Sequence, residues 1–176
     1  AEALGVAVAQ SHQELVDEVD LLVLGVKPQV LASVLNPLIL TKPILSMAAG
    51  TSLKYLDKLS QADLPIIRIM PNLNAKILQS STAICRNDKV SDQLFKIAKQ
   101  ITDSLGTTFE IAEKDFDTFT ALAGSSPAYI ALFIEAMSKA GLKHGFPKDL
   151  AFKIVSQTVL ATTSNLIQGQ EKPNDL

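Results

Sequence analysis

The chain has 176 residues, of which 47% are hydrophobic and 19% charged, and its formal net charge is -2 at pH 7. This length and apolar content are enough for one ordinary domain, or two small ones, with a hydrophobic core. The slightly negative charge argues against binding to nucleic acid or to an anionic membrane surface, because both need a basic field.

The first two thirds of the sequence alternate short apolar runs with amphipathic segments, a pattern typical of α/β proteins. Ser11 and Glu14 form a capping box, which predicts a helix over 12–18. The continuous apolar run at 21–26 predicts a strand buried on both faces. Pro28 suits the first position of a helix whose apolar residues follow at helical spacing: Val30, Leu31, Val34, Leu35 and Leu38.

The same unit then repeats. Residues 43–47 are typical of a strand and Ala48-Ala49-Gly50 of a tight turn. Ser52 is the predicted cap of a helix with an apolar face formed by Leu53, Leu56 and Leu59. Residues 64–70 form the next predicted strand, which ends at Pro71-Asn72.

A shorter strand is expected at 83–86. Ser91 is predicted to cap a long helix that Gly106 ends, and its apolar face carries Leu94, Ile97, Ala98, Ile101 and Leu105. Residues 107–111 complete this part as a final strand.

Beyond about Glu113 the sequence indicates helices alone. The segment 114–122 is predicted to be helical with Phe116, Phe119 and Ala123 inward, and Gly124-Ser125-Ser126-Pro127 breaks the helix. Residues 127–140 are apolar almost all round, and Pro147 begins another helix that reaches about Ile167. We therefore expect an α/β domain over 1–112 and the first part of an all-helical domain over 113–176, whose apolar helices need a partner.

The sequence offers little for metal or thiol chemistry. Cys85 is the only cysteine, so an internal disulfide and a multi-cysteine zinc site are excluded. We expect it to be a reduced thiol in the core of a cytoplasmic protein. His12 and His144 are far apart in polar surroundings and predict no metal site.

No membrane segment is expected. The chain does not open on a charged and then apolar leader, and the apolar stretch 128–140 is interrupted by Glu135 and Lys139. A helix buried in a helical assembly is the better interpretation of this stretch.

Three predicted strand ends are candidates for a ligand site, because open α/β sheets bind ligands beyond the carboxyl ends of their strands. These ends are Gly25-Val26-Lys27-Pro28, Met47-Ala48-Ala49-Gly50 and Met70-Pro71-Asn72. Small residues there let backbone approach a ligand, and Lys27 offers a positive charge to a phosphate or carboxylate. The alternative is that glycine and proline serve turn geometry alone, and the residues leave both interpretations open.

Other motifs are weaker. The phosphate-binding pattern Gly-x-Gly-x-x-Gly is absent from the sequence, which argues against a complete dinucleotide-binding domain but not against a truncated one. Gly124-Ser125-Ser126 lacks the spacing of a nucleophile elbow. Asp115 and Asp117 face different ways on a helix and, like Glu135, are better explained as solvated charges than as an acid/base set.

On these residues the sequence resembles the pyrroline-5-carboxylate reductase family, in order and over nearly the whole chain. Gly25–Pro28 resembles the family's Val-Lys-Pro turn, Ser46–Gly50 its Ala-Ala-Gly turn, and Ile67–Asn72 its Arg-x-Met-Pro-Asn strand end. The most specific match is Phe116–Tyr129, which resembles the opening of the helical dimerisation domain. Gly141–Pro147 and Gln157–Val159 continue the resemblance.

The resemblance implies an incomplete Rossmann-like parallel-sheet domain followed by an all-helical dimerisation domain. It implies NADP(H) or NAD(H) as cofactor and 1-pyrroline-5-carboxylate as substrate, which is reduced to L-proline in the last step of proline biosynthesis. The implied cofactor-binding residues are Gly25, Val26, Lys27, Pro28, Ala48, Ala49, Gly50 and Asn72. Gln170 and Glu171 lie near a substrate-pocket position, and no catalytic residue is identified.

The same resemblance implies a homodimer or higher homo-oligomer, formed through the helices of 127–167, in the cytoplasm. Asn74 and Ser126 depart from the family pattern, where proline and glycine are usual. The family's glycine-rich loop and its Ser-Pro-Gly-Gly-Thr-Thr substrate loop do not occur in the sequence, so we expect the chain alone to be inactive.

Two alternatives remain open at this point. A dehydrogenase of the hydroxyacid class needs a lysine on the helix after the domain junction, and Ser138-Lys139 is a poor match for it. A non-catalytic dimerising fragment would pair through its helices without binding a cofactor.

Overall fold

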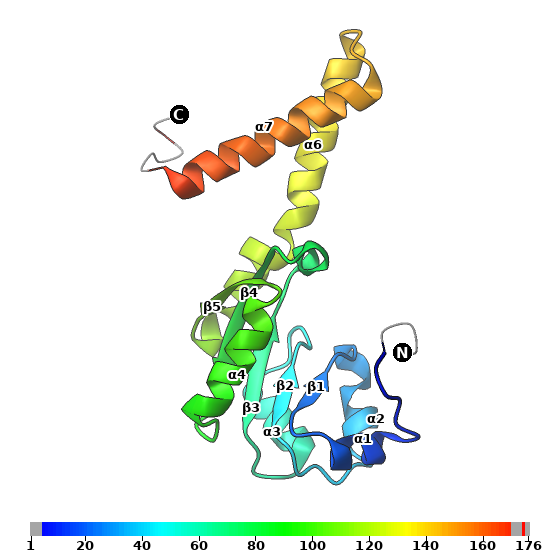
Figure 1. The fold of residues 1–176 in the computed structure, drawn as a ribbon, viewed down its shortest axis with the longest axis vertical. Coiled ribbons are helices and arrows are strands. Elements are labelled where there is room, and N and C mark those ends of the chain that lie inside the picture. The colour runs from blue at the N-terminus through cyan, green and yellow to red at the C-terminus, as the bar shows by residue number, and fades with distance from the viewer. Residues whose placement is uncertain (1–4, 170–173, 175–176) are drawn as a thin grey trace. The chain divides into compact units, whose positions relative to one another are not determined.

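The computed structural model describes residues 5–169 and 174. These residues form two compact units, which divide between Ser125 and Ser126 (Figure 1). The first is an α/β unit and the second is a pair of long helices.

The first unit is built on a five-stranded sheet of order β1-β2-β3-β4-β5. Its strands are β1 (Leu22–Leu24), β2 (Ile44–Ser46), β3 (Ile66–Met70), β4 (Ser80–Arg86) and β5 (Gly106–Glu110). The β1–β2, β2–β3 and β4–β5 pairs are parallel, whereas β4 runs antiparallel to β3. The sheet is thus mostly parallel, as predicted, and β1, β2 and β3 end at the same edge.

Three serine caps fix the helix starts that the sequence predicts. The hydroxyls of Ser11, Ser52 and Ser91 accept hydrogen bonds from the backbone N–H groups three residues later. They begin α1 (His12–Glu18), α3 (Leu53–Ser60) and α4 (Asp92–Asp103). Between α1 and α3 lie the short helices η2 (Pro28–Val30) and α2 (Leu31–Leu35). These cap hydrogen bonds confirm the predicted starts of the three helices.

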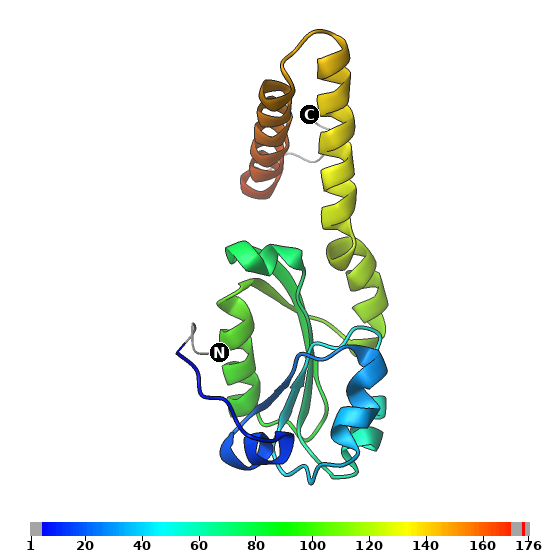
Figure 2. The ribbon, with the colours of Figure 1, turned by 90° about the vertical axis from the view of Figure 1, so that its right-hand side faces the viewer.

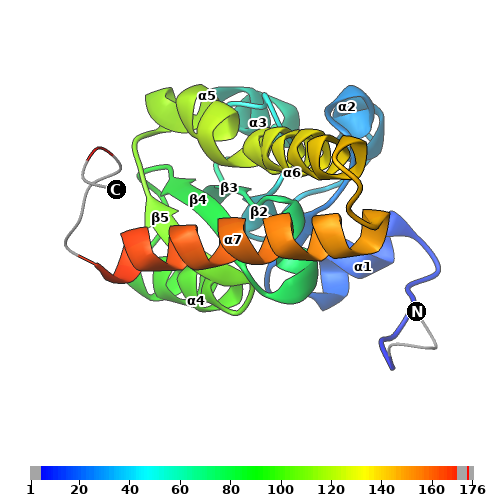
Figure 3. The ribbon, with the colours of Figure 1, turned by 90° about the horizontal axis from the view of Figure 1, so that it is seen from above.

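The strands alternate their side chains between two apolar layers. Ile44 and Ile66 face α2 and α3, whereas Leu45 and Ile67 face α4 with Phe95. Figures 2 and 3 show α3 and α4 on opposite sides of the strands. This two-sided cover is what a mostly parallel sheet requires.

Several predicted details of the sheet are wrong. Val23 was expected to be buried but is 49% exposed, because α4 does not extend over β1. The strand expected at 83–86 begins at Ser80 and is longer than β3, because backbone pairing with β5 carries it through Ser80, Ser81 and Thr82.

The inward face of α4 also differs from the predicted one. The buried residues are Phe95, Ala98 and Thr102, while Ile97 and Ile101 are exposed. The Phe95 ring occupies the space over the sheet, and the Arg86 guanidinium stacks on it at 4.4 Å. Val30, which was predicted on the apolar face of the helix after Pro28, lies in η2 and is exposed, whereas Leu31 and Leu35 are buried.

The helix η3 (Leu73–Ile77) links β3 to β4. After β5 the first unit ends with η4 (Glu113–Asp115), α5 (Phe116–Phe119) and the π-helical turn η5 (Thr120–Gly124). Phe116 is buried against Ala83 and Cys85, with Phe119 packed beside it. Both phenylalanines therefore point inward, as predicted.

The second unit consists of α6 (Ser126–Lys143) and α7 (Lys148–Gln168). The helices meet near Gly141, where an added Cβ would lie 3.2 Å from Ala151 Cβ. In α6 no residue is buried, and in α7 only Ala151 is. The expected apolar surface on these helices is therefore uncovered within the described part of this chain.

The helical stretch Glu113–Lys143 is long and apolar enough to cross a membrane by length and composition alone, because it contains an 18-residue window with a mean hydropathy of 1.2. The two charges that interrupt it, Glu135 and Lys139, form an ion pair of 2.6 Å along one face of α6. These two charges alone therefore do not exclude a membrane span.

Candidate functional site

The three predicted turns meet at one edge of the sheet. Leu24, Ser46 and Arg68 are register partners across β1, β2 and β3. Because these strands are parallel, Gly25–Pro28, Met47–Gly50 and Met70–Asn72 leave the sheet at adjacent positions. The structure thus brings together all the sequence-predicted cofactor residues that it describes.

Small exposed residues shape the first two turns. The Met47 N–H donates to Leu24 O at 3.2 Å, and a Cβ on Gly25 would lie 4.0 Å from Met47 Sδ. Gly50 has a φ of +66° with open space around it. Such a backbone can accept a ligand at close range.

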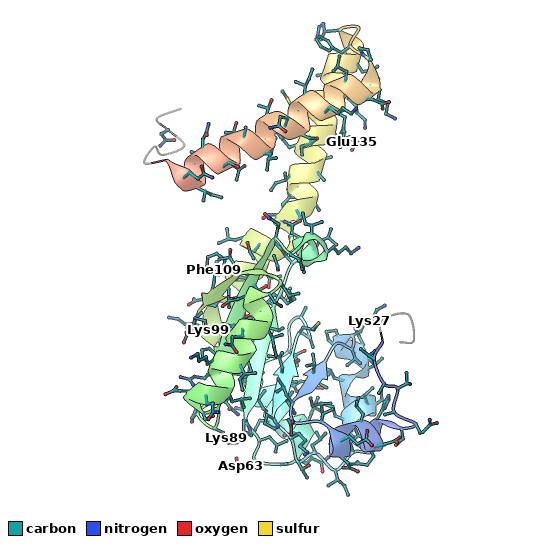
Figure 4. All side chains as sticks on the ribbon, viewed as in Figure 1. Lys27, Asp63, Lys89, Lys99, Phe109 and Glu135 are labelled. Carbon is teal, nitrogen blue, oxygen red and sulfur yellow. The ribbon has the colours of Figure 1, made fainter. Side chains whose placement is uncertain are left out.

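Lys27 supplies the positive charge at this edge. It is separated from the end of β1 by Gly25 and Val26 and precedes the 3-10 turn that begins at Pro28. Its side chain is exposed (Figure 4). Ala48 is buried, whereas Ala49 and Gly50 are exposed. The turns therefore offer backbone and one cation rather than a set of charged side chains.

Asn72 takes part in three hydrogen bonds within the chain. Its backbone N–H donates to Ser80 Oγ at 3.1 Å, and its Oδ1 accepts from the Asn74 N–H at 3.1 Å. Its Nδ2 donates to Ala123 O in η5, also at 3.1 Å. The side chain therefore joins the end of β3 to the turn that precedes α6.

Sequence reasoning missed an ion pair beneath this edge. Arg68 Nη1 lies 2.7 Å from Glu113 Oε1, and the same oxygen accepts the Leu53 N–H at 2.6 Å. The Arg68 guanidinium stacks on the Phe116 ring at 4.4 Å. An arginine inside a buried apolar strand was the signal, because such a charge needs a partner.

No acid/base set or metal cluster emerges among the described residues. Asp115, Asp117, His12 and His144 are exposed, and no group of three or more metal-binding side chains is found there. Asp115 and Asp117 are solvated, as the sequence indicated. Burial raises the pKa of the Cys85 thiol to about 11, so this cysteine is a core residue.

The hollows of the surface lie elsewhere. One of about 640 Å³ runs along Ala7–Leu15, and another of about 380 Å³ lies between α6 and α7. Neither is lined by a predicted cofactor residue, whereas a hollow of about 160 Å³ beside β1 includes Val26. The candidate site therefore lies at the strand ends and not in one of the two larger hollows. Gln170 and Glu171 lie outside the described residues.

Known proteins share this arrangement. The family described as pyrroline-5-carboxylate reductase dimerisation matches residues 113–176. A crystal structure of 1-pyrroline-5-carboxylate reductase from Streptococcus pyogenes matches with a TM-score of 0.95 and 58% identity, over 99% of this chain and 67% of that one. The chain belongs to the pyrroline-5-carboxylate reductase family.

Other family members agree. The pyrroline-5-carboxylate reductase of Glycine max is 38% identical over 99% of this chain and 65% of that protein. The Plasmodium falciparum pyrroline carboxylate reductase, solved with NADP bound, has a TM-score of 0.87 at 32% identity, over 93% of this chain and 63% of that one. The chain thus spans about two thirds of the length of the reductases it matches.

The reductase family match and the packing divide the chain at different points. The dimerisation family begins at Glu113, where the sequence also suggests the change to helices. Residues 113–125 pack with the sheet, and the second compact unit begins at Ser126. The segment 113–125 therefore lies within the range of the family match but packs with the α/β unit.

Proposed function

We propose that the complete protein is an NAD(P)H-dependent pyrroline-5-carboxylate reductase, which reduces 1-pyrroline-5-carboxylate to L-proline in proline biosynthesis. The observation that carries the proposal is the convergence of three small-residue turns at the carboxyl edge of β1–β3, in a chain 58% identical to a reductase of that activity. Ligands of open α/β sheets bind at such an edge.

The residues of this edge fit a nicotinamide dinucleotide. Gly25 and Gly50 leave space for the cofactor at the backbone, and the exposed Lys27 matches a group that carries phosphates. The Plasmodium falciparum relative has NADP bound. We assign cofactor contacts to Gly25–Pro28 and Ala48–Gly50, whereas Asn72, at the third turn, is hydrogen-bonded within the chain.

When bound, the reduced nicotinamide supplies the hydride for the imine carbon. The protein's own part is to hold the two reactants in contact and to exclude water, which requires no strong general base. The sheet edge contributes shape and one cation.

We further propose that the complete protein is a cytoplasmic homodimer, or a larger homo-oligomer, formed through the helices of 127–167. The match of 113–176 to a dimerisation family supports a second copy, rather than lipid, as the cover for α6 and α7. Neither the net charge of -2 nor this match favours nucleic acid as a partner.

The test is oxidation of NADPH and of NADH by the complete protein, followed by absorbance as 1-pyrroline-5-carboxylate is added. We expect oxidation with proline as the product. Lys27→Ala should raise the KM for the cofactor about 10-fold, the loss of one charge-assisted hydrogen bond. Lys54→Ala, which removes an exposed lysine of α3, is the matched control.

Two results would count against the proposal. A folded complete protein that oxidises neither cofactor would leave only a family scaffold without this activity. An unchanged cofactor KM in Lys27→Ala would move the cofactor away from this edge. The 176-residue chain alone should be inactive, because its sequence lacks the glycine-rich phosphate motif.

A further inference from the structure

The long helical stretch is interrupted at a defined point. In η5 the Ser125 N–H donates to Thr120 O at 2.9 Å, a bond to the fifth residue back instead of the fourth. Such π-helical turns interrupt the regular hydrogen bonding of an α-helix and are frequent at functional sites. Here the turn stands immediately before α6.

Pro127 explains which hydrogen bond is lost. In an α-helix the N–H of residue 127 would donate to Ala123 O, but proline has no N–H. Asn72 Nδ2 donates to this same carbonyl at 3.1 Å. A side chain from the end of β3 thus supplies the donor that the helix lacks.

The turn is also packed against the strand end. A Cβ on Gly124 would lie 3.5 Å from Met70 Cε and 3.2 Å from Thr120 Cγ2, so the backbone passes close to both. Met70 and Asn72 flank Pro71 at the edge where the cofactor is proposed to bind. The π-helical turn therefore contacts Met70 and Asn72 at the edge of the candidate site.

We propose that Asn72 is a positioning residue, which acts through the Ala123 carbonyl to hold the π-helical turn at the cofactor edge. This proposal rests on the proposed function. This role differs from a direct cofactor contact by Asn72. The effect of Asn72 depends on the Ala123 carbonyl, which lacks an α-helical donor because Pro127 has no N–H. The role of Asn72 is to hold this turn against the end of β3 within the first unit.

A double-mutant cycle on the complete protein tests this role. Asn72→Ala should lower kcat about 10-fold, and speed amide hydrogen exchange in the segment 120–126 by a similar factor, as expected for one lost hydrogen bond. The cofactor KM should change less than about 2-fold, because the cofactor contacts of the other turns remain. Pro127→Ala restores an N–H four residues after Ala123, so in that background both effects of Asn72→Ala should shrink to about 2-fold.

Two further variants sharpen the cycle. Asn72→Asp keeps the size and the acceptor for the Asn74 N–H but lacks the donor, so it should reproduce the exchange effect of Asn72→Ala in a folded protein. Asn74→Ala removes an exposed amide two residues away and should change neither readout.

The proposal would be overturned in favour of a direct cofactor contact if Asn72→Ala lowered kcat equally in the wild-type and Pro127→Ala backgrounds and also raised the cofactor KM. Unchanged exchange at 120–126 in Asn72→Ala would also overturn it. An inactive wild-type protein would instead contradict the proposed function, and hydrogen exchange would still decide whether Asn72 holds the turn.

Discussion

Arg68 and Cys85 are register partners on β3 and β4, and both are buried. Burial raises the pKa of the Cys85 thiol, the Arg68 charge lowers it and the Glu113 charge raises it, which leaves it at about 11 against an ordinary 9.0. The neutral thiol is therefore the form that the folded protein prefers.

We predict that Cys85 resists alkylation by iodoacetamide in the native protein at pH 8. The raised pKa alone lowers its thiolate population about 100-fold relative to the unfolded chain, since each unit of pKa is a factor of ten in ionisation. Mass spectrometry of time-quenched samples, native and in urea, gives the ratio. Equal rates in both states would show that the thiol is not buried as described.

The same pKa fixes a pH dependence of stability. Between about pH 9 and 11 the unfolded thiol loses its proton and the folded one keeps it, so the free energy of unfolding falls as the pH rises. The stabilisation is complete below pH 9 and is lost through this window. Cys85→Ala should lack this part of the slope in urea titrations.

At the scale of elements, one carboxylate joins three segments that are distant in sequence. Glu113 of η4 accepts from Arg68 of β3 and from the backbone of Leu53, the first residue of α3. The Arg68 side chain is 9% exposed and that of Glu113 33%. The strand, the helix that follows the Ala48–Gly50 turn, and the start of the helical segment therefore share one anchor.

We predict that Glu113→Ala destabilises the α/β unit by roughly 3 kcal/mol, because it leaves the buried Arg68 guanidinium without its carboxylate. Glu113→Gln keeps an acceptor and should cost less. The control is Glu110→Ala, which breaks an exposed pair with Lys99 and should cost under about 0.5 kcal/mol.

Urea midpoints followed by circular dichroism measure these differences. Equal midpoints for Glu113→Ala and Glu110→Ala would mean that the Arg68–Glu113 pair does not anchor these elements.

At the scale of the whole molecule, the first unit buries its apolar side chains within the chain, whereas the helical unit leaves many of them exposed. The sheet buries its side chains between α2 and α3 on one face and α4 on the other. The helical pair leaves large apolar side chains exposed, among them Tyr129, Leu132, Phe133, Phe152 and Leu160. A surface of this kind marks an interface.

We predict that the protein self-associates through this surface. Leu160 is 62% exposed in the chain, so Leu160→Lys should leave the helices folded. Placing a charge in the interface should raise the dimer dissociation constant at least about 100-fold. Sedimentation equilibrium measures the constant, and circular dichroism checks the helix content. A wild-type protein that stays monomeric and partitions into lipid vesicles would contradict the proposed homodimer.

The features that the sequence predicted well depend on neighbours along the chain. Ser11, Ser52 and Ser91 begin helices by bonding to residues three positions away, and Pro71 ends a strand by its own ring. The ordered motifs were also enough to identify the family, because each lies within a short stretch. The candidate site residues at the three strand ends were proposed from the same local signals.

What only the tertiary structure decided depends on contacts between distant segments. The antiparallel pairing of β4 with β3 is one case, and the exposed Val23 is another. The Arg68–Glu113 bond spans 45 residues and the Asn72–Ala123 bond 51. A sequence pattern reports the periodicity of one segment, but the partner of a buried arginine or of an unpaired carbonyl is chosen by how the segments pack. The sequence by itself therefore determined the elements and the family, whereas packing determined the joints between them.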